Sequence, residues 1–164
     1  MAILNTVSGA AAAYSLRKIN ADYTGKCIKV RRNSDNAEQE IAFDTNGNLS
    51  ANSKIEDGTT SFSTWYGSDS VYITKWYDQS GNNKNAIRNT STLQPRIVID
   101  GAICTNTNGK PEVNFRELGN HSLSVANDSI LNFGTGNFST NSVVTKWEFE
   151  FDNITLVKSF IIDK

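Results

Sequence analysis

The amino-acid sequence predicts a mainly β protein, an antiparallel β-sandwich or jelly roll with one short helix near the N-terminus. The first observation is composition: hydrophobic residues make up 38% and charged residues 20% of the 164. Asn, Ser, Thr and Gly fill much of the remainder, which suits short strands joined by many turns. The second observation is a series of short alternating segments separated by turn clusters. The length fits one domain over residues 1–164.

The helix is predicted over about residues 9–19. Ser8 can cap its N-terminus, and the small residues 9–13 include four alanines, the best helix formers. Asn20 and Gly25 mark the exit from this segment. A helix this short is marginal alone, so we expect it to dock on the sheets.

Strands are predicted wherever apolar and polar side chains alternate between turn signals. The segment 71–77 is the strongest because it contains β-branched and aromatic residues such as Val71, Ile73 and Trp76. Asn46-Gly47 is a turn signal, and the polar segment 48–61 is predicted to be a long loop. The predicted strands are 26–32, 41–44, 71–77, 96–99, 112–115 and 122–125.

The C-terminal segment has the cleanest alternation in the chain. Three aromatic residues alternate with Glu148, Glu150 and Asp152 over residues 147–152, which predicts a strand with one apolar and one acidic face. A last strand is expected over residues 154–162. Apolar strand faces that a small sandwich leaves uncovered favour pairing with another subunit. The subunit-interface candidates are Trp147, Phe149, Phe151, Leu156 and Phe160.

Bulk properties exclude several partners. Sixteen basic and 17 acidic residues are spread along the chain with no basic stripe, which argues against nucleic acid. No apolar run is long enough for membrane insertion. The N-terminus lacks a secretory signal pattern, so we expect synthesis and folding in the cytoplasm. Cys27 and Cys104 do not form a zinc motif; they are either two buried thiols or one disulfide, and no cofactor is expected.

Two groups of oxygen-bearing side chains have the spacing of a chemical site. Glu148, Glu150 and Asp152 are most simply a solvated strand face, although alternate strand positions could hold a pair of catalytic carboxylates. Asp78, Ser80 and Asn82 have the spacing of the start of a calcium loop without its later glycine and glutamate. A hydrogen-bonded turn after the central strand is the main interpretation, and a metal site is the alternative.

The remaining candidates are aromatic or titratable. His121 is the only histidine, and no nucleophile motif stands near it, so a surface role is expected. Trp65-Tyr66, in a setting of Ser, Thr and Gly, is the best candidate for an exposed stacking surface. We therefore name Trp65 and Tyr66 as candidate glycan-binding residues.

Several segments together resemble a known family. They are 13–18 (AYSLRK), 23–25, 28–32, 34–36, 76–82 (WYDQSGN) and 108–111 (NGKP). In this order, over roughly the first 115 residues, they resemble the N-terminal part of the arabinofuranosidase B catalytic-domain family. The resemblance implies a concanavalin/laminin-G-like sandwich. No position matches the family's catalytic carboxylates, so the chain is not expected to be an enzyme.

Similar sequences without a signal peptide look like bacteriophage structural proteins. The resemblance implies a virion protein, either a tail-fibre or tail-tip component or a capsid-decorating one, assembled in the host cytoplasm. Its expected partners are other virion proteins and further copies of itself in a homo-oligomer. Whether the chain also contacts a host surface glycan, or only other virion proteins, is left open by the sequence. Two alternatives are a divergent arabinofuranosidase-like hydrolase that uses Glu148 or Glu150, and a free-standing carbohydrate-binding module.

Overall fold

The protein is mainly β, with antiparallel strands and very little helix. The structure is a computed structural model and describes residues 3–6, 9–115, 120–131 and 160–163. The helical elements are η1 (Ile3–Asn5), α1 (Phe62–Tyr66), η2 (Ser91–Leu93) and η3 (Ser129–Leu131). The strands are β1 (Ala12–Ser15), β2 (Ile28–Arg32), β3 (Glu38–Ile41), β4 (Val71–Trp76), β5 (Ala86–Ile87), β6 (Arg96–Ile99), β7 (Ala102–Ile103) and β8 (Phe160–Asp163).

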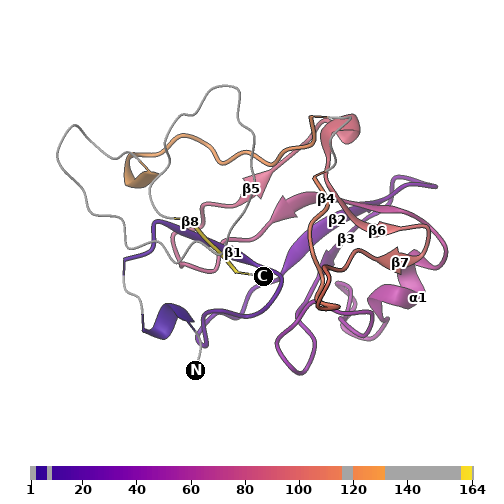
Figure 1. The fold of residues 1–164 in the computed structure, drawn as a ribbon, viewed down its shortest axis with the longest axis horizontal. Coiled ribbons are helices and arrows are strands. Elements are labelled where there is room, and N and C mark those ends of the chain that lie inside the picture. The colour runs from indigo at the N-terminus through magenta and orange to yellow at the C-terminus, as the bar shows by residue number, and fades with distance from the viewer. Residues whose placement is uncertain (1–2, 7–8, 116–119, 132–159, 164) are drawn as a thin grey trace.

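The larger sheet has β4 near its centre. Its strand order is β3-β2-β4-β6-β7, with β5 also paired to β4, and every pairing is antiparallel (Figure 1). Val30 lies opposite Ile73 on the face that packs into the core, whereas Arg31 lies opposite Tyr72 on the other face. A register shift between Lys29 and Val30 interrupts the ladder. The period-two alternation of the sequence therefore separates an apolar face from a polar one.

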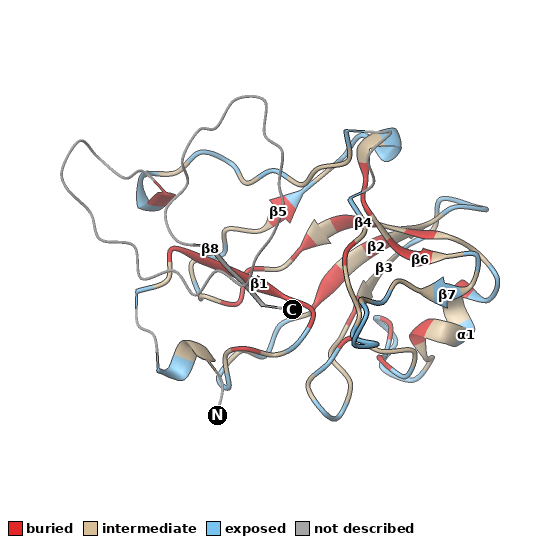
Figure 2. Cartoon of the chain, in the orientation of Figure 1, coloured by how far each residue is buried: buried red, intermediate tan, exposed pale blue. Residues whose placement is uncertain are grey.

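The smaller sheet consists of β1 and β8, which pair in parallel. All four β1 residues are buried (Figure 2). Ala12 and Tyr14 belong to the same hydrophobic cluster as Ile28 and Ile73 of the larger sheet. Two sheets thus share one core in a sandwich-type arrangement, and the predicted fold class is confirmed.

The predicted helix over residues 9–19 is wrong. Gly9 has a φ of +78°, outside the helical region, and β1 (Ala12–Ser15) occupies the centre of the segment. A strand with both faces buried favours small side chains, so the alanines serve close packing there. The backbone of Ala13 is held by the distant residues Asp78 and Gln79. Long-range hydrogen bonds and burial override the local helix propensity of alanine.

The α-helix of the described residues, α1, begins directly after the predicted loop 48–61, in a segment for which the sequence predicted no helix. Ser61 caps α1: its Oγ accepts a hydrogen bond from Thr64 N. Phe62 and Tyr66 face the core one turn apart, with their rings edge to face at 4.8 Å between centroids. The apolar spacing of four residues was present in the sequence, but the aromatic side chains favoured a surface interpretation.

Other predictions have mixed outcomes. β4 and β6 match, whereas the strand predicted at 41–44 lies earlier, as β3. The segments 112–115 and 122–125 contribute only single bridges, Arg96 with Asn114 and Ile87 with Ser124. Of the interface candidates, Trp147, Phe149, Phe151 and Leu156 lie outside the described residues, as do Glu148, Glu150 and Asp152; only the backbone of Phe160 is described, in β8.

The structure also shows the state of the two cysteines and the length of the helices. No disulfide joins Cys27 to Cys104, and Cys27 is buried whereas Cys104 is only half-buried. Within the described part of the chain, no helix has the length and apolarity required to cross a bilayer.

Candidate functional site

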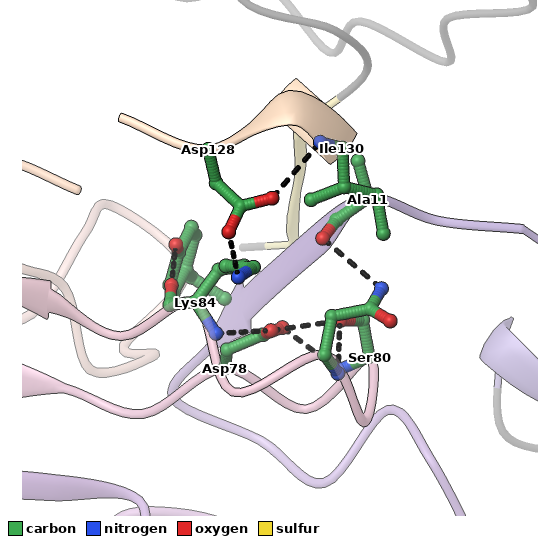
Figure 3. A network of polar contacts seen from close by, with 8 residues as sticks. Ala11, Asp78, Ser80, Lys84, Asp128 and Ile130 are labelled. Atoms are coloured by element: carbon green, nitrogen blue, oxygen red, sulfur yellow. Dashed lines mark hydrogen bonds and ion pairs between the residues drawn. The ribbon is translucent and has the colours of Figure 1, made fainter. Parts of the chain in front are cut away.

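The turn after β4 is organised by the Asp78 carboxylate. Its Oδ1 accepts hydrogen bonds from Ala13 N and Ser80 N, both at 2.8 Å. Its Oδ2 accepts from Ser80 Oγ at 2.7 Å and from Lys84 N at 2.9 Å (Figure 3). Asp78 is only 4% exposed. Four protein donors on one buried carboxylate are what a hydrogen-bonded turn requires, so the main interpretation of Asp78 and Ser80 is confirmed.

The neighbouring amides extend this turn into a clamp on the N-terminal segment. Gln79 Oε1 accepts from Ile19 N, and Gln79 Nε2 donates to the carbonyls of Ser15 and Arg17. Asn82 Nδ2 donates to the carbonyl oxygens of Ala10 and Ala11. We call Asp78, Gln79 and Asn82 the β1 clamp. The WYDQSGN segment is thus used to hold the chain together.

Lys84 ties a third segment to this clamp. Its Nζ lies 2.5 Å from Asp128 Oδ2, and Asp128 Oδ1 accepts from Ile130 N at the start of η3 (Figure 3). The Lys84 ammonium lowers the pKa of Asp128. Tyr14 donates its hydroxyl proton to the Lys84 carbonyl, and burial raises the pKa of that phenol. These contacts join β1, the turn after β4 and η3.

The predicted stacking surface at Trp65 and Tyr66 differs from expectation. Tyr66 is 5% exposed and packs in the core, so its ring does not form a surface platform. Trp65 is half-buried, and the Arg32 guanidinium lies over its ring at 4.9 Å from the centroid. Arg32 also pairs with Asp35 at 2.6 Å and lies 3.8 Å from Asp69. The charge beside Trp65 is therefore balanced by carboxylates.

The ring of Tyr72, which lies on the polar face of the large sheet, has a different environment from that of Trp65 in α1. Tyr72 of β4 is half-buried, between Arg31 of β2 and Arg96 of β6. The guanidinium carbons lie 4.8 Å and 5.9 Å from the ring centroid. These distances are within the range of cation–π contacts. Three adjacent antiparallel strands thus bring one tyrosine and two arginines together.

A buried glutamine fixes one of these arginines. Gln94 is 2% exposed; its Oε1 accepts a hydrogen bond of 2.9 Å from Arg31 Nε. Gln94 Nε2 donates to the carbonyl of Arg88, which holds the amide in that orientation. Arg31 NH1 also donates to Asn36 Oδ1. Arg31 is therefore positioned before any ligand arrives.

Arg96 and His121 contain the unpartnered groups of this face. Arg96 Nε and His121 Nδ1 are buried atoms with no hydrogen-bond partner. Burial, and secondarily the positive charge of Arg96, lowers the pKa of His121. We define the Tyr72 face as Arg31, Tyr72, Gln94, Arg96 and His121. Its arginines form no ion pair with any carboxylate of the described residues.

Sequence reasoning missed the Tyr72 face. Tyr72 lies 41 positions after Arg31 and 24 positions before Arg96 in the sequence. Each of the three residues belongs to a strand that was predicted. The alternation of each strand was a weak signal, because Arg96 lies two positions from fully buried Val98 and Tyr72 two positions from buried Thr74. Knowing which strands are adjacent, and in which register, was the missing information.

The fold and this face define a mainly β, sandwich-type protein with an arginine–tyrosine surface on its larger sheet. No protein-family model matches the chain, and no curated protein matches it. A solved structure titled "Crystal structure of arabinofuranosidase complexed with arabinofuranosyl-alpha-1,2-xylobiose" is 24% identical, with a TM-score of 0.38. The match covers 56% of this chain and 18% of that chain.

Proposed function

We propose that this chain is a non-catalytic binding protein that attaches to a saccharide through the Tyr72 face. The observation that carries the proposal is the half-buried Tyr72 ring flanked by Arg31 and Arg96, with the Arg96 side chain donating no hydrogen bond to the described residues. An aromatic side chain with a few converging polar groups is a common way to hold a small polar ligand.

The rigidity of the face supports this role. Tyr72 stands in a strand paired on both sides, and buried Gln94 holds Arg31. Side chains that are already ordered lose less conformational entropy when a ligand binds. The other polar groups singled out from the sequence, Asp78 and Asn82, are engaged in the β1 clamp.

The biological setting that we propose is a bacteriophage virion, with this chain as a tail-fibre, tail-tip or capsid-decorating component. Support for it comes from the sequence resemblance. In that setting the saccharide belongs to the host surface, and the remaining partners are other virion proteins and further copies of the chain. Light scattering during size exclusion tests self-association: a defined oligomer supports it, and a monomer at high concentration contradicts it.

A glycan array with the purified chain tests saccharide binding. Tyr72→Ala is expected to weaken the signal about tenfold or more, because it removes the ring on which the ligand rests. Tyr72→Phe keeps the ring and is expected to retain most of the signal. Circular dichroism on each variant confirms that it is folded.

Three results would overturn the proposal. The wild type gives no sugar-dependent signal; Trp65→Ala abolishes binding while Tyr72→Ala does not; or the chain releases arabinose from a model arabinofuranoside. The third result supports the hydrolase alternative if Glu148→Gln or Glu150→Gln abolishes the turnover.

A further inference from the structure

We infer that the ligand of the Tyr72 face carries a carboxylate or sulfate group, which Arg96 holds with the help of Arg31. This inference rests on the proposed function, because it names the chemistry of the saccharide that the same face takes. It is carried by the charge balance and by the hydrogen-bond inventory of the face.

The arginines of the large sheet contact two aromatic rings, Trp65 and Tyr72, and the charge balance beside these two rings differs. Beside Trp65, Arg32 has Asp35 at 2.6 Å and Asp69 at 3.8 Å. Beside Tyr72, Arg31 and Arg96 have the same kind of ring contact, but neither forms an ion pair with a carboxylate in the described part of the chain. Two guanidinium groups share one ring without a counter-charge, which favours binding of an anion there.

The hydrogen-bond inventory points to the same group. Arg31 already uses Nε for Gln94 and NH1 for Asn36. Arg96 uses none of its five N–H donors on the described residues, and its Nε is a buried atom. Because Arg96 Nε is buried, a ligand would bind the two terminal guanidinium nitrogens instead. Their paired N–H groups match the two oxygen atoms of a carboxylate or sulfate.

The neighbouring histidine does not supply the missing negative charge. His121 is either neutral or positive, and its Nδ1 is also a buried atom without a partner. Gln94 is a neutral amide already engaged by Arg31 and by the Arg88 carbonyl. No side chain defined as part of the Tyr72 face is an anion, so the compensating charge is left to the ligand.

The test uses three probes on the whole chain: sodium sulfate, an oligosaccharide that ends in glucuronate, and the same oligosaccharide ending in glucose. Binding is followed by NMR through the ¹⁵N–¹H signal of Arg96 Nε and by isothermal titration calorimetry. We expect the glucuronate-terminated sugar to bind at least about tenfold more tightly than the neutral one, and added salt to weaken it.

Matched variants separate charge from geometry. Arg96→Gln removes the charge and is expected to abolish the preference for glucuronate. Arg96→Lys keeps the charge without the fork and is expected to retain only part of it. Lys110→Gln, an exposed residue in the turn after β7, removes one positive charge elsewhere and is expected to change nothing.

The outcomes distinguish the two proposals. In one outcome the two sugars bind equally well, with Tyr72→Ala abolishing the binding of both. That result would overturn the anion inference and leave the saccharide proposal intact. Sulfate binding that depends on Arg96, without binding of either sugar, would support an anion site and overturn saccharide binding. If Lys110→Gln weakens glucuronate binding as much as Arg96→Gln, only the net charge matters and the inference is wrong.

Discussion

The β1 clamp gives the sharpest prediction about stability. In Asp78→Asn, one carboxylate oxygen becomes an NH₂ group, which cannot accept the two hydrogen bonds that each oxygen receives. Two buried donors lose their acceptor, at about 1.5–3 kcal/mol for each bond to a charged group. The expected loss in the free energy of unfolding is about 3–6 kcal/mol.

Urea denaturation followed by tryptophan fluorescence measures this loss, because Trp76 lies beside the turn and donates from Nε1 to the Ser15 carbonyl. With a mid-range urea m-value of about 2 kcal/mol/M, the midpoint falls by about 1.5–3 M. Asp57→Asn is the matched control: its carboxylate also accepts from a turn, from Thr59 N and Thr60 N, but it is exposed. An equal or larger shift for Asp57→Asn would refute the view that the clamp holds β1.

Three further predictions follow from backbone strain, packing and titration. Gly101→Ala should destabilise the protein more than Gly109→Ala: both glycines have positive φ, but a Cβ at Gly101 would lie 2.9 Å from the Gly67 carbonyl oxygen, whereas that at Gly109 meets open space. Equal melting temperatures would contradict this. Phe62→Ala removes a fully buried ring under α1 and should cost about 3–5 kcal/mol in chemical denaturation; a loss below about 1 kcal/mol would mean that α1 is not packed on the core. The lowered folded-state pKa of His121 means that the unfolded chain binds the proton more tightly, so stability should fall as pH drops from 7 to 5 through the unfolded value of about 6.5. His121→Gln should flatten that slope in pH-dependent denaturation, and an unchanged slope would assign it to another group.

The sequence was sufficient for the fold class and for the strongest strands. β4 and β6 were recognisable because their β-branched and aromatic residues lie between turn signals. The same local rules failed for residues 9–19, where alanine's helix propensity competed with hydrogen bonds that Ala13 N and Ile19 N donate to Asp78 and Gln79, 65 and 60 positions away. No local pattern contains such a partner.

In the candidate site too, contacts between residues close in sequence were predicted, whereas contacts between distant strands were not. The turn at Asp78 was predicted because its side chain accepts from the backbone two residues later, at Ser80, which is a local contact. Tyr72 was assigned to a strand but not to a site, since its neighbours Arg31 and Arg96 are brought by β2 and β6. Trp65 and Tyr66 were selected for composition alone, and burial in the folded chain decided against Tyr66.

The parallel pairing of β1 with β8 has a consequence for synthesis on the ribosome. Ala12 pairs with Phe160, so the two strands emerge 148 residues apart. At about 5–20 residues per second, β1 is exposed for roughly 7–30 s before its partner exists. The turn that contains Asp78 emerges in the first half of that interval and can engage Ala13 long before the chain is finished. The hydrogen bonds of the clamp would therefore give β1 polar partners on the backbone before β8 is synthesised.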